Sequence, residues 1–485
     1  MSRVVLVSNR VLDLSKAARA GGVAVTVANI ARTHKALWFG WNGEVKRAGE
    51  VDFVEREGRI ATAPLSDIDY AGYYLGYANS VLWPVFHNRL DLAQLEADFF
   101  QQYVEVNRRL AALLQPLLRA EDIIWVHDYH LIPFAAELRK RGVGNPIGFY
   151  LHIPFPPWQT FMAVPEHQEL ARALVSYDLI GLQTRSDVGN LLDYLSNAAH
   201  GRIVPDGRIR VFERLVSIAS FPVGIDVTDF AKAKRVSGLV QARSSVSRIV
   251  GVDRLDYTKG LPQKFKAFGR LLEKYPQYQR RVVLTQIAPP TRESVEAYSD
   301  IRHELETLAG SINGRLGELD WVPIHYIYRS TPRGRLGDIY RSSRICMVTP
   351  LRDGMNLVAK EYVAAQDAAD PGVLILSKFA GAAEEMTEAL IVNPYSIEET
   401  ADVIRGALEM TLAERCARHR ALLVGVQKND AAAWSRSFLE HLKRVRSTND
   451  PSGWRPREFI RTVPEDLQRS IRPELRPHTE PTRRS

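Results

Sequence analysis

Cysteine is scarce in this sequence. Only Cys346 and Cys416 occur among its 485 residues, too few for a disulfide framework, which fits a reducing compartment. Long hydrophobic runs are missing too: the first, residues 4–7, ends at Ser8, and no later run approaches the roughly 18 residues of a membrane span. We therefore expect a cytoplasmic protein that does not engage a membrane.

Familiar nucleotide and catalytic motifs are also absent. No G-x-G-x-x-G follows a predicted strand, and the P-loop, H-E-x-x-H and G-x-S-x-G patterns do not occur. Each of these spacings serves one chemistry, so their absence disfavours NAD-type binding, P-loop phosphate binding, zinc proteolysis and the hydrolase elbow. The function has to be sought in other residues.

Positive charge is in modest excess, with 64 Lys+Arg against 56 Asp+Glu and a net charge of +8. The basic residues are dispersed among acids, which disfavours nucleic-acid binding and suits a protein that handles anionic small molecules. Residues 447–485 mix Arg, Pro and acids, a composition that cannot pack a core. We predict a disordered Pro/Arg-rich tail there.

What the sequence does have is an alternation of short β-branched runs and longer segments of helical period, typical of parallel sheets with crossover helices. The clearest strands are predicted at 4–8, 123–127, 147–152, 248–252, 282–287, 345–349 and 373–377. A breaker-rich stretch, 221–226, predicts a linker near residue 225.

This pattern predicts an α/β fold of two facing Rossmann-like, doubly wound domains, with the active site in the cleft between them. The N-terminal domain is expected to span 1–225 and the C-terminal domain 226–446. The period of the last predicted helix, 431–446, does not identify its partner domain, so packing back on the N-terminal domain stays open.

In open α/β sheets, ligands bind beyond the carboxyl ends of the strands. Arg10 follows the first strand, and Gly21-Gly22 precedes a helical segment, where backbone N–H groups can meet a phosphate or simply form a turn. His127 ends the next predicted strand and Asp128 follows it, and His152 ends the strand after that.

With His130, these three side chains are acceptable metal ligands. Adjacent strand residues point to opposite faces, however, so His127 and Asp128 cannot readily share one ion. Substrate binding is favoured over a metal site and over purely structural hydrogen bonding. His152, held before the stiff Ile153-Pro154 entrance, suits a hydroxyl ligand.

The second half carries cations at the same kind of position. Arg254 and Lys259 follow the strand at 248–252 in a turn that leads to a helix. A guanidinium fork, an ammonium and a helix N-terminus suit a diphosphate, although nearby aspartates can pair with these cations instead. Arg292 lies on the same rim, beyond the strand at 282–287.

The strongest motif spans 349–361. Asp353-Gly354 offers an acceptor and a permissive turn, Met355 to Val358 begin a helix with free N–H groups, and Glu361 lies one turn further on. Such a terminus can bind phosphate and ribose hydroxyls together. A capped core helix with an exposed glutamate would have the same sequence pattern, so this structural alternative stays open.

With these segments in place, the sequence resembles the trehalose-6-phosphate synthase family of retaining glucosyltransferases over about residues 1–446. The matching segments are 8–10, 21–22, 38–41, 82–87, 125–130, 151–156, 253–260 and 352–361. The resemblance implies transfer of glucose from a nucleotide sugar, usually UDP-glucose, to glucose 6-phosphate, giving α,α-trehalose 6-phosphate and UDP. It implies no metal and no other cofactor.

It also implies that the N-terminal domain binds the acceptor and the C-terminal domain binds the nucleotide sugar. The protein is implied to be a homo-oligomer, a dimer or a tetramer. Since no phosphatase motif such as D-x-D-x-T is present, a separate trehalose-6-phosphate phosphatase is expected to take the product to free trehalose.

The resemblance implies a role for each matched residue. The residues implied to bind glucose 6-phosphate are Arg10 and Arg292, which clamp its phosphate, and Tyr74, Trp83 and Asp128. The residues implied to bind the nucleotide-sugar donor are Gly21, Gly22, Arg254, Lys259, Thr331, Asp353, Gly354, Met355, Asn356, Leu357, Val358, Ala359, Lys360 and Glu361.

Within this set, the implied catalytic residues are Arg254 and Lys259 on the diphosphate and His152 and Asp353 on the transferred glucose. Glu361 is implied to hold the ribose, and Trp83 and Ile153 to select the α anomer. A same-face displacement is favoured, with Asp353 binding the sugar rather than attacking it.

Three alternatives stay open. Residues 327–332 depart from the family pattern beside the nucleobase, so ADP- or GDP-glucose is an alternative donor. Glycerol 3-phosphate is an alternative acceptor, since an arginine clamp holds any phosphate, although Tyr74 and Trp83 favour a bulkier sugar. A non-catalytic nucleotide-sugar sensor is the alternative from another class.

Overall fold

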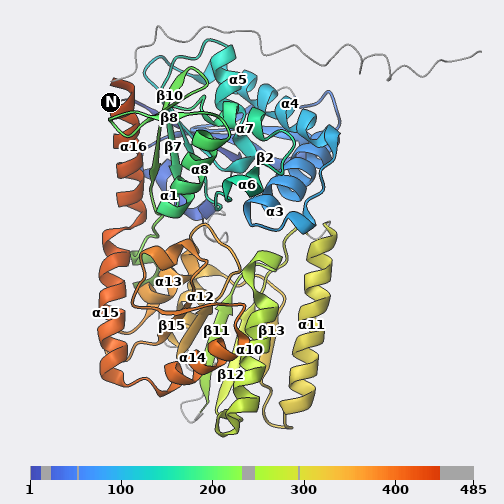
Figure 1. The fold of residues 1–485 in the computed structure, drawn as a ribbon, viewed down its shortest axis with the longest axis vertical. Helices are drawn as coiled ribbons and strands as arrows, with labels where there is room; N and C mark the ends of the chain where they lie inside the picture. Colours follow the sequence, from blue (N-terminus) through green and yellow to red (C-terminus); the bar gives the residue numbers. More distant parts are fainter. Residues whose placement is uncertain (1, 12–22, 52–53, 232–245, 293–294, 448–485) are drawn as a thin grey trace, which may run out of the picture. The chain divides into compact units, whose positions relative to one another are not determined.

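The computed structural model describes residues 2–11, 23–51, 54–231, 246–292 and 295–447, which build two mainly parallel β-sheets (Figure 1). The first sheet has the strand order β3-β4-β2-β1-β5-β6-β7-β10-β9-β8. Antiparallel pairs occur at its two edges, between β3 and β4 and among β8, β9 and β10. Its strands are β1 (Val4–Arg10), β2 (Leu37–Lys46), β3 (Glu55–Glu57), β4 (Ile60–Ser66), β5 (Ile123–His127), β6 (Ile147–Tyr150), β7 (Leu179–Leu182), β8 (Arg202–Ile203), β9 (Ile209–Val211) and β10 (Arg214–Ser220).

Helices cover both faces of this sheet, which is why its central strands are apolar throughout. On β1, Val5 and Val7 face one core, while Val4 and Leu6 face the other. The first core lies under α4 (Ala97–Leu114), α5 (Phe134–Lys140), α7 (His167–Leu174) and α8 (Arg185–Asn197), and the second under α1 (Val23–Thr33). This half also contains the 13-residue π-helix η2 (Tyr70–Leu82) and the short helices α2 (Asp67–Asp69), α3 (Trp83–Phe86) and α6 (Trp158–Phe161), and the short helix α9 (Thr228–Ala231) follows β10.

The second sheet has the order β13-β12-β11-β14-β15-β16 with every neighbouring pair parallel. Counted along the chain this is the 3-2-1-4-5-6 order of a Rossmann fold. Its strands are β11 (Ser247–Val252), β12 (Val282–Ile287), β13 (Ile324–Ile327), β14 (Ile345–Val348), β15 (Val373–Ser377) and β16 (Leu390–Val392). One face is covered by α10 (Leu261–Lys274), α11 (Glu296–Leu316) and α14 (Ile397–Glu409), the other by α12 (Arg333–Arg341), α13 (Leu357–Ala365) and α15 (Leu412–Lys428).

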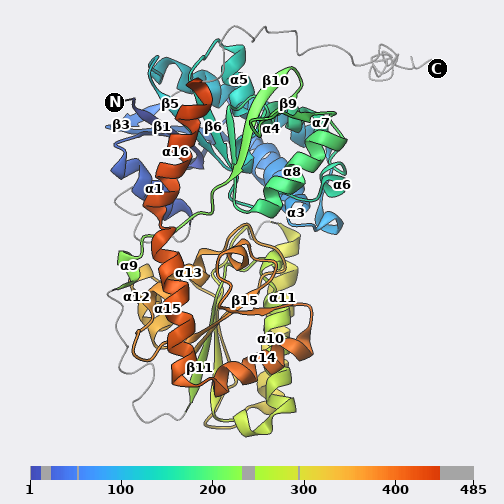
Figure 2. The same ribbon diagram turned by 60° about the vertical axis from the view of Figure 1, so that its left-hand side comes forward.

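The last helix, α16 (Ala431–Ser447), returns to the first sheet, whereas α15 before it packs on the second (Figure 2). The Phe438 ring lies over Gly148 and Gly181, where a Cβ atom would come within 2.8 Å and 2.7 Å of it. The same ring stacks on Trp125, with centroids 4.5 Å apart. Only glycines in β6 and β7 let an aromatic ring sit this close to the strands.

The two chain crossings between the sheets run side by side. A Cβ atom at Gly224 would lie 2.1 Å from the Asn429 carbonyl oxygen, and the Ala431 N–H donates to the Ile225 carbonyl at 3.1 Å. Glycine is therefore required at position 224.

The predicted fold class, two Rossmann-like sheets in an α/β protein, is confirmed. The domain limits 1–225 and 226–446 stay a prediction, and residues 448–485 of the predicted tail lie outside the described residues. Strand β6 ends at Tyr150, two residues before the predicted end. Across the described ranges, no helix is both long and apolar enough to cross a membrane.

Candidate functional site

Arg292 lies at the centre of a cluster that joins the two sheets. It follows β12 with φ +48°, and its guanidinium donates to the Tyr298 hydroxyl at 2.6 Å and to the Tyr129 hydroxyl at 3.1 Å. Its Cζ lies 4.0 Å from the centre of the Trp83 ring. Burial opposes the charge, but the neighbouring phenols and Asp256, 3.8 Å away, outweigh it and raise the pKa of Arg292.

Trp83 supports a second cation on this cluster. The exposed Arg254 places its Cζ 5.4 Å from the centre of the same ring, within the range of a cation–π contact. The ring of His87 packs on Trp83 at 4.2 Å, and its Nδ1 bonds the Trp83 carbonyl at 2.7 Å. Burial lowers the pKa of His87 to about 4, so this ring is neutral and donates from Nδ1.

Asp128 lies beside this cluster at the end of β5. Its φ of +79° is in the left-handed region, and its Oδ1 accepts from the backbone N–H groups of Tyr129 at 3.1 Å and His152 at 3.2 Å. Burial raises the pKa of Asp128 to about 6, although these bonds and the charges of Arg292 and Arg254 act in the opposite direction.

Tyr74 and Arg10 occupy an aromatic patch on the first sheet. Tyr74 stacks on His130 with centroids 5.9 Å apart and lies 5.4 Å from the ring of Trp41. The Arg10 guanidinium carbon lies 5.5 Å from the centre of the same Trp41 ring. Tyr74 also contributes to the raised pKa of Arg292, which places the patch next to the arginine cluster.

A second cluster forms where the loops after β11 and β14 meet. Lys259 Nζ lies 2.6 Å from Asp353 Oδ2, and Asn356 Nδ2 donates to the same oxygen at 3.0 Å. Burial works to raise the pKa of Asp353, but the Lys259 ammonium outweighs it and holds the pKa below its usual value. Asp353 is thus an ionised carboxylate whose Oδ2 accepts both of these bonds.

The loop that carries Asp353 is fixed from both sides. The Leu351 N–H donates to Thr258 O at 2.8 Å, and the Asp353 N–H donates to Phe379 O at 3.1 Å, in the loop that follows β15. A Cβ atom at Gly354 would lie 2.3 Å from the His152 carbonyl oxygen. This close approach, which only glycine allows, sets the second sheet's loop against the first sheet's His152.

Helix α13 begins at Leu357, two residues later than the first predicted position, because Asn356 before it has φ +81°. Glu361, one turn in, is 6% exposed. Its carboxylate accepts from the Tyr340 hydroxyl at 3.3 Å and lies 4.0 Å from Arg333. Burial raises the pKa of Glu361 to about 7, with Arg333 and Tyr340 opposing the shift.

The structure does not bring every predicted donor side chain to this point. Lys360 points elsewhere, donating to Val223 O at 2.8 Å and to Glu385 at 2.7 Å. Thr331 is half-buried in the loop before α12, and the side chain of Ile153 is buried beside His152. Met355, Leu357 and Ala359 are buried, and Val358 is half-buried. Gly21 and Gly22 lie outside the described residues.

His127 and His152 form a buried pair. Their Nδ1 and Nε2 atoms are 3.1 Å apart. Burial lowers the pKa of both rings, to about 3 for His152, so both are neutral. Over the part of the chain that the structure describes, no three His, Cys, Asp or Glu side chains are grouped so that they could hold a metal ion.

Several site residues were not predicted from the sequence. Tyr129 lies within the matching segment 125–130, and its place between Asp128 and His130 was the available signal. Tyr298 on α11 and Arg333 on α12 follow the predicted Arg292 and Thr331 by only a few residues, but their contacts with the site depend on how these helices pack, which no local pattern specifies.

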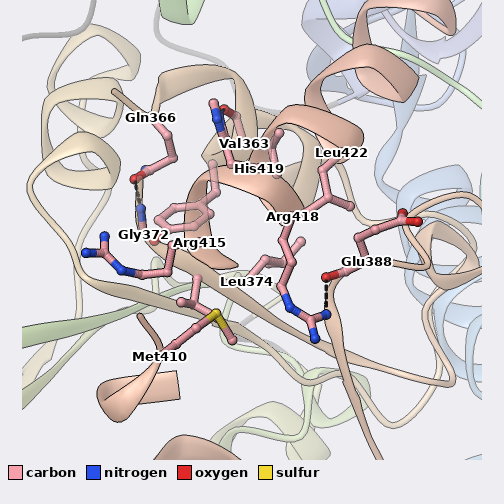
Figure 3. Close-up of a pocket in the computed structure, with 12 residues that line it drawn as sticks. Val363, Gln366, Gly372, Leu374, Glu388, Met410, Arg415, Arg418, His419 and Leu422 are labelled. Carbon is pink, nitrogen blue, oxygen red and sulfur yellow. Dashed lines mark hydrogen bonds between the residues drawn. The ribbon is translucent and has the colours of Figure 1, made fainter. Parts of the chain in front are cut away.

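A small pocket lies away from this site, between α13, β15 and α15 (Figure 3). Arg418 on its wall donates to the Glu388 carbonyl at 3.0 Å, and His419 bonds the Val363 carbonyl at 3.1 Å. None of the predicted site residues lines this pocket.

Two Rossmann-like sheets that meet in a cluster of cations and carboxylates define a class, the glycosyltransferases built from two such domains. The sequence model of glycosyltransferase family 20 matches residues 6–444. The chain therefore belongs to glycosyltransferase family 20.

Its relatives agree over nearly the whole length. The trehalose-6-phosphate synthase of Klebsiella pneumoniae subsp. pneumoniae is 47% identical over 96% of this chain and 99% of its own. An α,α-trehalose-phosphate synthase (UDP-forming) from Burkholderia xenovorans, solved in complex with glucose-6-phosphate, superposes with a TM-score of 0.86 at 47% identity, covering 91% of this chain and 100% of that one. An E. coli structure bound with UDP-2-fluoro glucose gives a TM-score of 0.86 at 46% identity, covering 91% and 99%.

Proposed function

We propose that this enzyme transfers glucose from UDP-glucose to glucose 6-phosphate, releasing UDP and α,α-trehalose 6-phosphate, in trehalose biosynthesis. The observation that carries the proposal is the meeting of two clusters from the two sheets, Arg292 on Trp83 and Tyr129, and Lys259 on Asp353. Relatives at 46–47% identity were solved with glucose-6-phosphate and with a fluorinated UDP-glucose, which supports the same pair of substrates here.

The acceptor is assigned to the first cluster. Arg292, with Arg10, holds the phosphate of glucose 6-phosphate, because a guanidinium offers two parallel donors to a phosphate. The edges of the Trp83 and Tyr74 rings contact the sugar, because their faces already pack on Arg292, His87 and His130. The Asp128 carboxylate accepts from a sugar hydroxyl. Trp83 and Ile153 set the anomer.

The donor is assigned to the second cluster and to α13. Lys259 and Arg254 hold the diphosphate, and the free N–H groups at the start of α13, with Gly354, add partial positive charge. Glu361 accepts from the ribose hydroxyls, and the loop with Thr331 lies beside the base. His152 and Asp353 hold the glucose.

Retention follows from this arrangement by a same-face displacement. Charge grows on the diphosphate as the glycosidic bond breaks, and Arg254 and Lys259 stabilise it where it develops. The acceptor hydroxyl, held beside that phosphate, passes its proton to it. Asp353 acts as a sugar ligand, which agrees with its tie to Lys259 at 2.6 Å.

The test supplies purified protein with glucose 6-phosphate and UDP-, ADP- or GDP-glucose in EDTA, and follows nucleotide release and the product by NMR. We expect UDP and an α,α-linked disaccharide phosphate, with EDTA making no difference. Turnover with glycerol 3-phosphate and not with glucose 6-phosphate would show that the acceptor is glycerol 3-phosphate. UDP binding without any turnover would indicate a non-catalytic nucleotide-sugar sensor. Loss of activity in EDTA would overturn metal independence.

The wider context belongs to the same proposal. We infer a cytoplasmic homo-oligomer that hands trehalose 6-phosphate to a separate phosphatase. Gel filtration with light scattering tests the assembly state; a monomer at working concentration would contradict it.

A further inference from the structure

The histidine pair at the ends of β5 and β6 is held in an unusual environment. His127 and His152 are 2% and 8% exposed, and both are neutral because burial lowers their pKa values. A bond of 3.1 Å joins His127 Nδ1 to His152 Nε2. Of the described residues, none offers a hydrogen-bond partner to the other nitrogen of either ring, His127 Nε2 or His152 Nδ1.

Two proton arrangements satisfy the bond between these neutral rings. If His152 donates from Nε2, then Nδ1 of His127 accepts and the single ring proton of His127 lies on Nε2. If His127 donates, the leftover N–H is at Nδ1 of His152. In both cases one N–H is buried with no partner in the described protein, and a buried orphan N–H is costly.

The surroundings of the two rings decide between these arrangements. Both rings lie near Trp434 of α16, His127 at 6.3 Å and His152 at 6.0 Å, but the His127 ring also packs on Trp125 at 4.7 Å. His152 begins the loop that touches Gly354 and donates its backbone N–H to Asp128. Of the two, only His152 is at the site, so only its free nitrogen can be satisfied by a substrate hydroxyl.

We propose that His127 is a positioning residue: its Nδ1–H donates to His152 Nε2 and so fixes His152 as an Nδ1–H donor to a hydroxyl of the glucosyl group. This inference rests on the proposed function, since it names how the donor sugar is held. His127 itself touches no substrate. The pair lets a neutral histidine present one defined donor, without a charge in a buried place.

The test compares two substitutions that separate hydrogen bonding from packing. His127→Phe keeps an aromatic ring against Trp125 and Trp434 but has no donor. His127→Asn loses the ring but can place an amide N–H near the position of Nδ1. We expect His127→Phe to lower kcat/KM for UDP-glucose about tenfold, the effect of one lost bond to a buried group, and His127→Asn to stay within about threefold of the parent.

Two further readouts tie the effect to His152 and to the sugar. In a His152→Ala background, His127→Phe should cause no further loss, because a residue that acts through another has nothing left to act on. The Kd of UDP, which lacks glucose, should change by less than about twofold in His127→Phe. Three outcomes would each overturn the proposal. They are an equal loss of kcat/KM from His127→Phe in the parent and in the His152→Ala background, equal losses from His127→Asn and His127→Phe, and a loss of UDP affinity that matches the loss of kcat/KM.

His419 provides a matched control, since it is a buried histidine with one hydrogen bond, to Val363 O at 3.1 Å, and none to the site (Figure 3). His419→Phe should lower the melting temperature and leave kcat/KM for UDP-glucose and the Kd of UDP unchanged. If the parent enzyme shows no turnover with any donor and acceptor, the proposed function fails first and this inference falls with it. If the parent turns over and His127→Phe matches it, only the inference fails.

Discussion

The protein itself holds Arg292 in a defined position. Two phenols and the face of Trp83 hold its guanidinium, and its side chain is 7% exposed. A cation fixed in this way has little conformational entropy left to lose when it binds an anion, which favours tight and specific binding.

Replacing Arg292 with Lys should therefore weaken the acceptor and spare the donor. Lysine keeps the charge but cannot bond both phenols and a phosphate with a planar fork. We expect the KM for glucose 6-phosphate to rise by about ten- to a hundredfold, as for loss of a charge-assisted bond. Initial-rate kinetics with each substrate varied in turn measure this, with Tyr298→Phe as a milder control. An unchanged acceptor KM would contradict the assignment.

Glu361 should couple donor binding to pH. Its pKa is raised to about 7 by burial, so the carboxylate is mostly protonated below that value. Ribose hydroxyls donate to the ionised form, so UDP-glucose should bind more tightly as pH rises from about 6 to 8, by at most about tenfold per pH unit below the pKa. Calorimetry in buffers of different ionisation enthalpy should show proton release on binding.

Glu361→Gln supplies the control for this pH dependence, because an amide does not titrate. The variant should bind UDP-glucose with a flat profile over the same range. The free energy of unfolding gives a second test. Because the pKa of Glu361 is raised from 4.5 to about 7 on folding, the protein should lose stability as the pH rises through this window, and the variant should not show this loss. Equal pH slopes in parent and variant would refute the assignment of Glu361 to the ribose.

At this scale the sequence predicted residues and not their partners. Arg292, Asp353 and Glu361 follow strands or open a helix, so their positions could be inferred from local pattern. The phenols that hold Arg292 come from β5's end and from α11, and the Lys360 side chain turns to Val223. Such partnerships depend on tertiary packing, which no local window contains.

At the scale of elements, α16 is the piece that completes the first sheet. Its Phe438 ring fills the groove left by Gly148 and Gly181 and stacks on Trp125, and Trp434 contacts Tyr150 at 4.8 Å. The sequence predicted this helix from its period but not its partner, because an apolar stripe fits either sheet equally well.

Phe438→Ala should destabilise the protein by about 3–5 kcal/mol, since it removes a fully buried aromatic ring and leaves a cavity over two glycines. Arg436→Ala, on the exposed face of the same helix, should stay within about 0.5 kcal/mol. Urea unfolding followed by tryptophan fluorescence measures both. Equal midpoints for the two variants would show that α16 contributes little to the first sheet.

The seven predicted strands were all found, because β-branched runs between breakers identify buried parallel strands well. The π-helix η2, with Tyr74 on it, was not predicted: its apolar spacing follows neither the helical nor the strand period. The contact of His127 with His152 likewise depends on β5 and β6 being neighbours, a pairing that strand patterns do not specify.

At the scale of the whole molecule, each half alone lacks part of the site. The first sheet supplies Trp83 and Asp128, and the second supplies Arg292 and Lys259. Removing residues 448–485 should leave kcat and both KM values within about twofold of the full chain, because the described site residues lie in 2–447 and the family match ends at 444. Steady-state kinetics of a chain that ends at residue 447 check this; a lost activity would assign the tail a role.

The return of α16 also has a consequence for biosynthesis. The ribosome releases β1 to β10 first and the helix that covers them last, after the entire second sheet. Until then Trp125 and the glycine strip of β6 and β7 lack their cover, so the half that is made first cannot finish folding first. A nascent chain stalled before Ala431 should expose this strip, and chaperones that bind apolar surface should find it there.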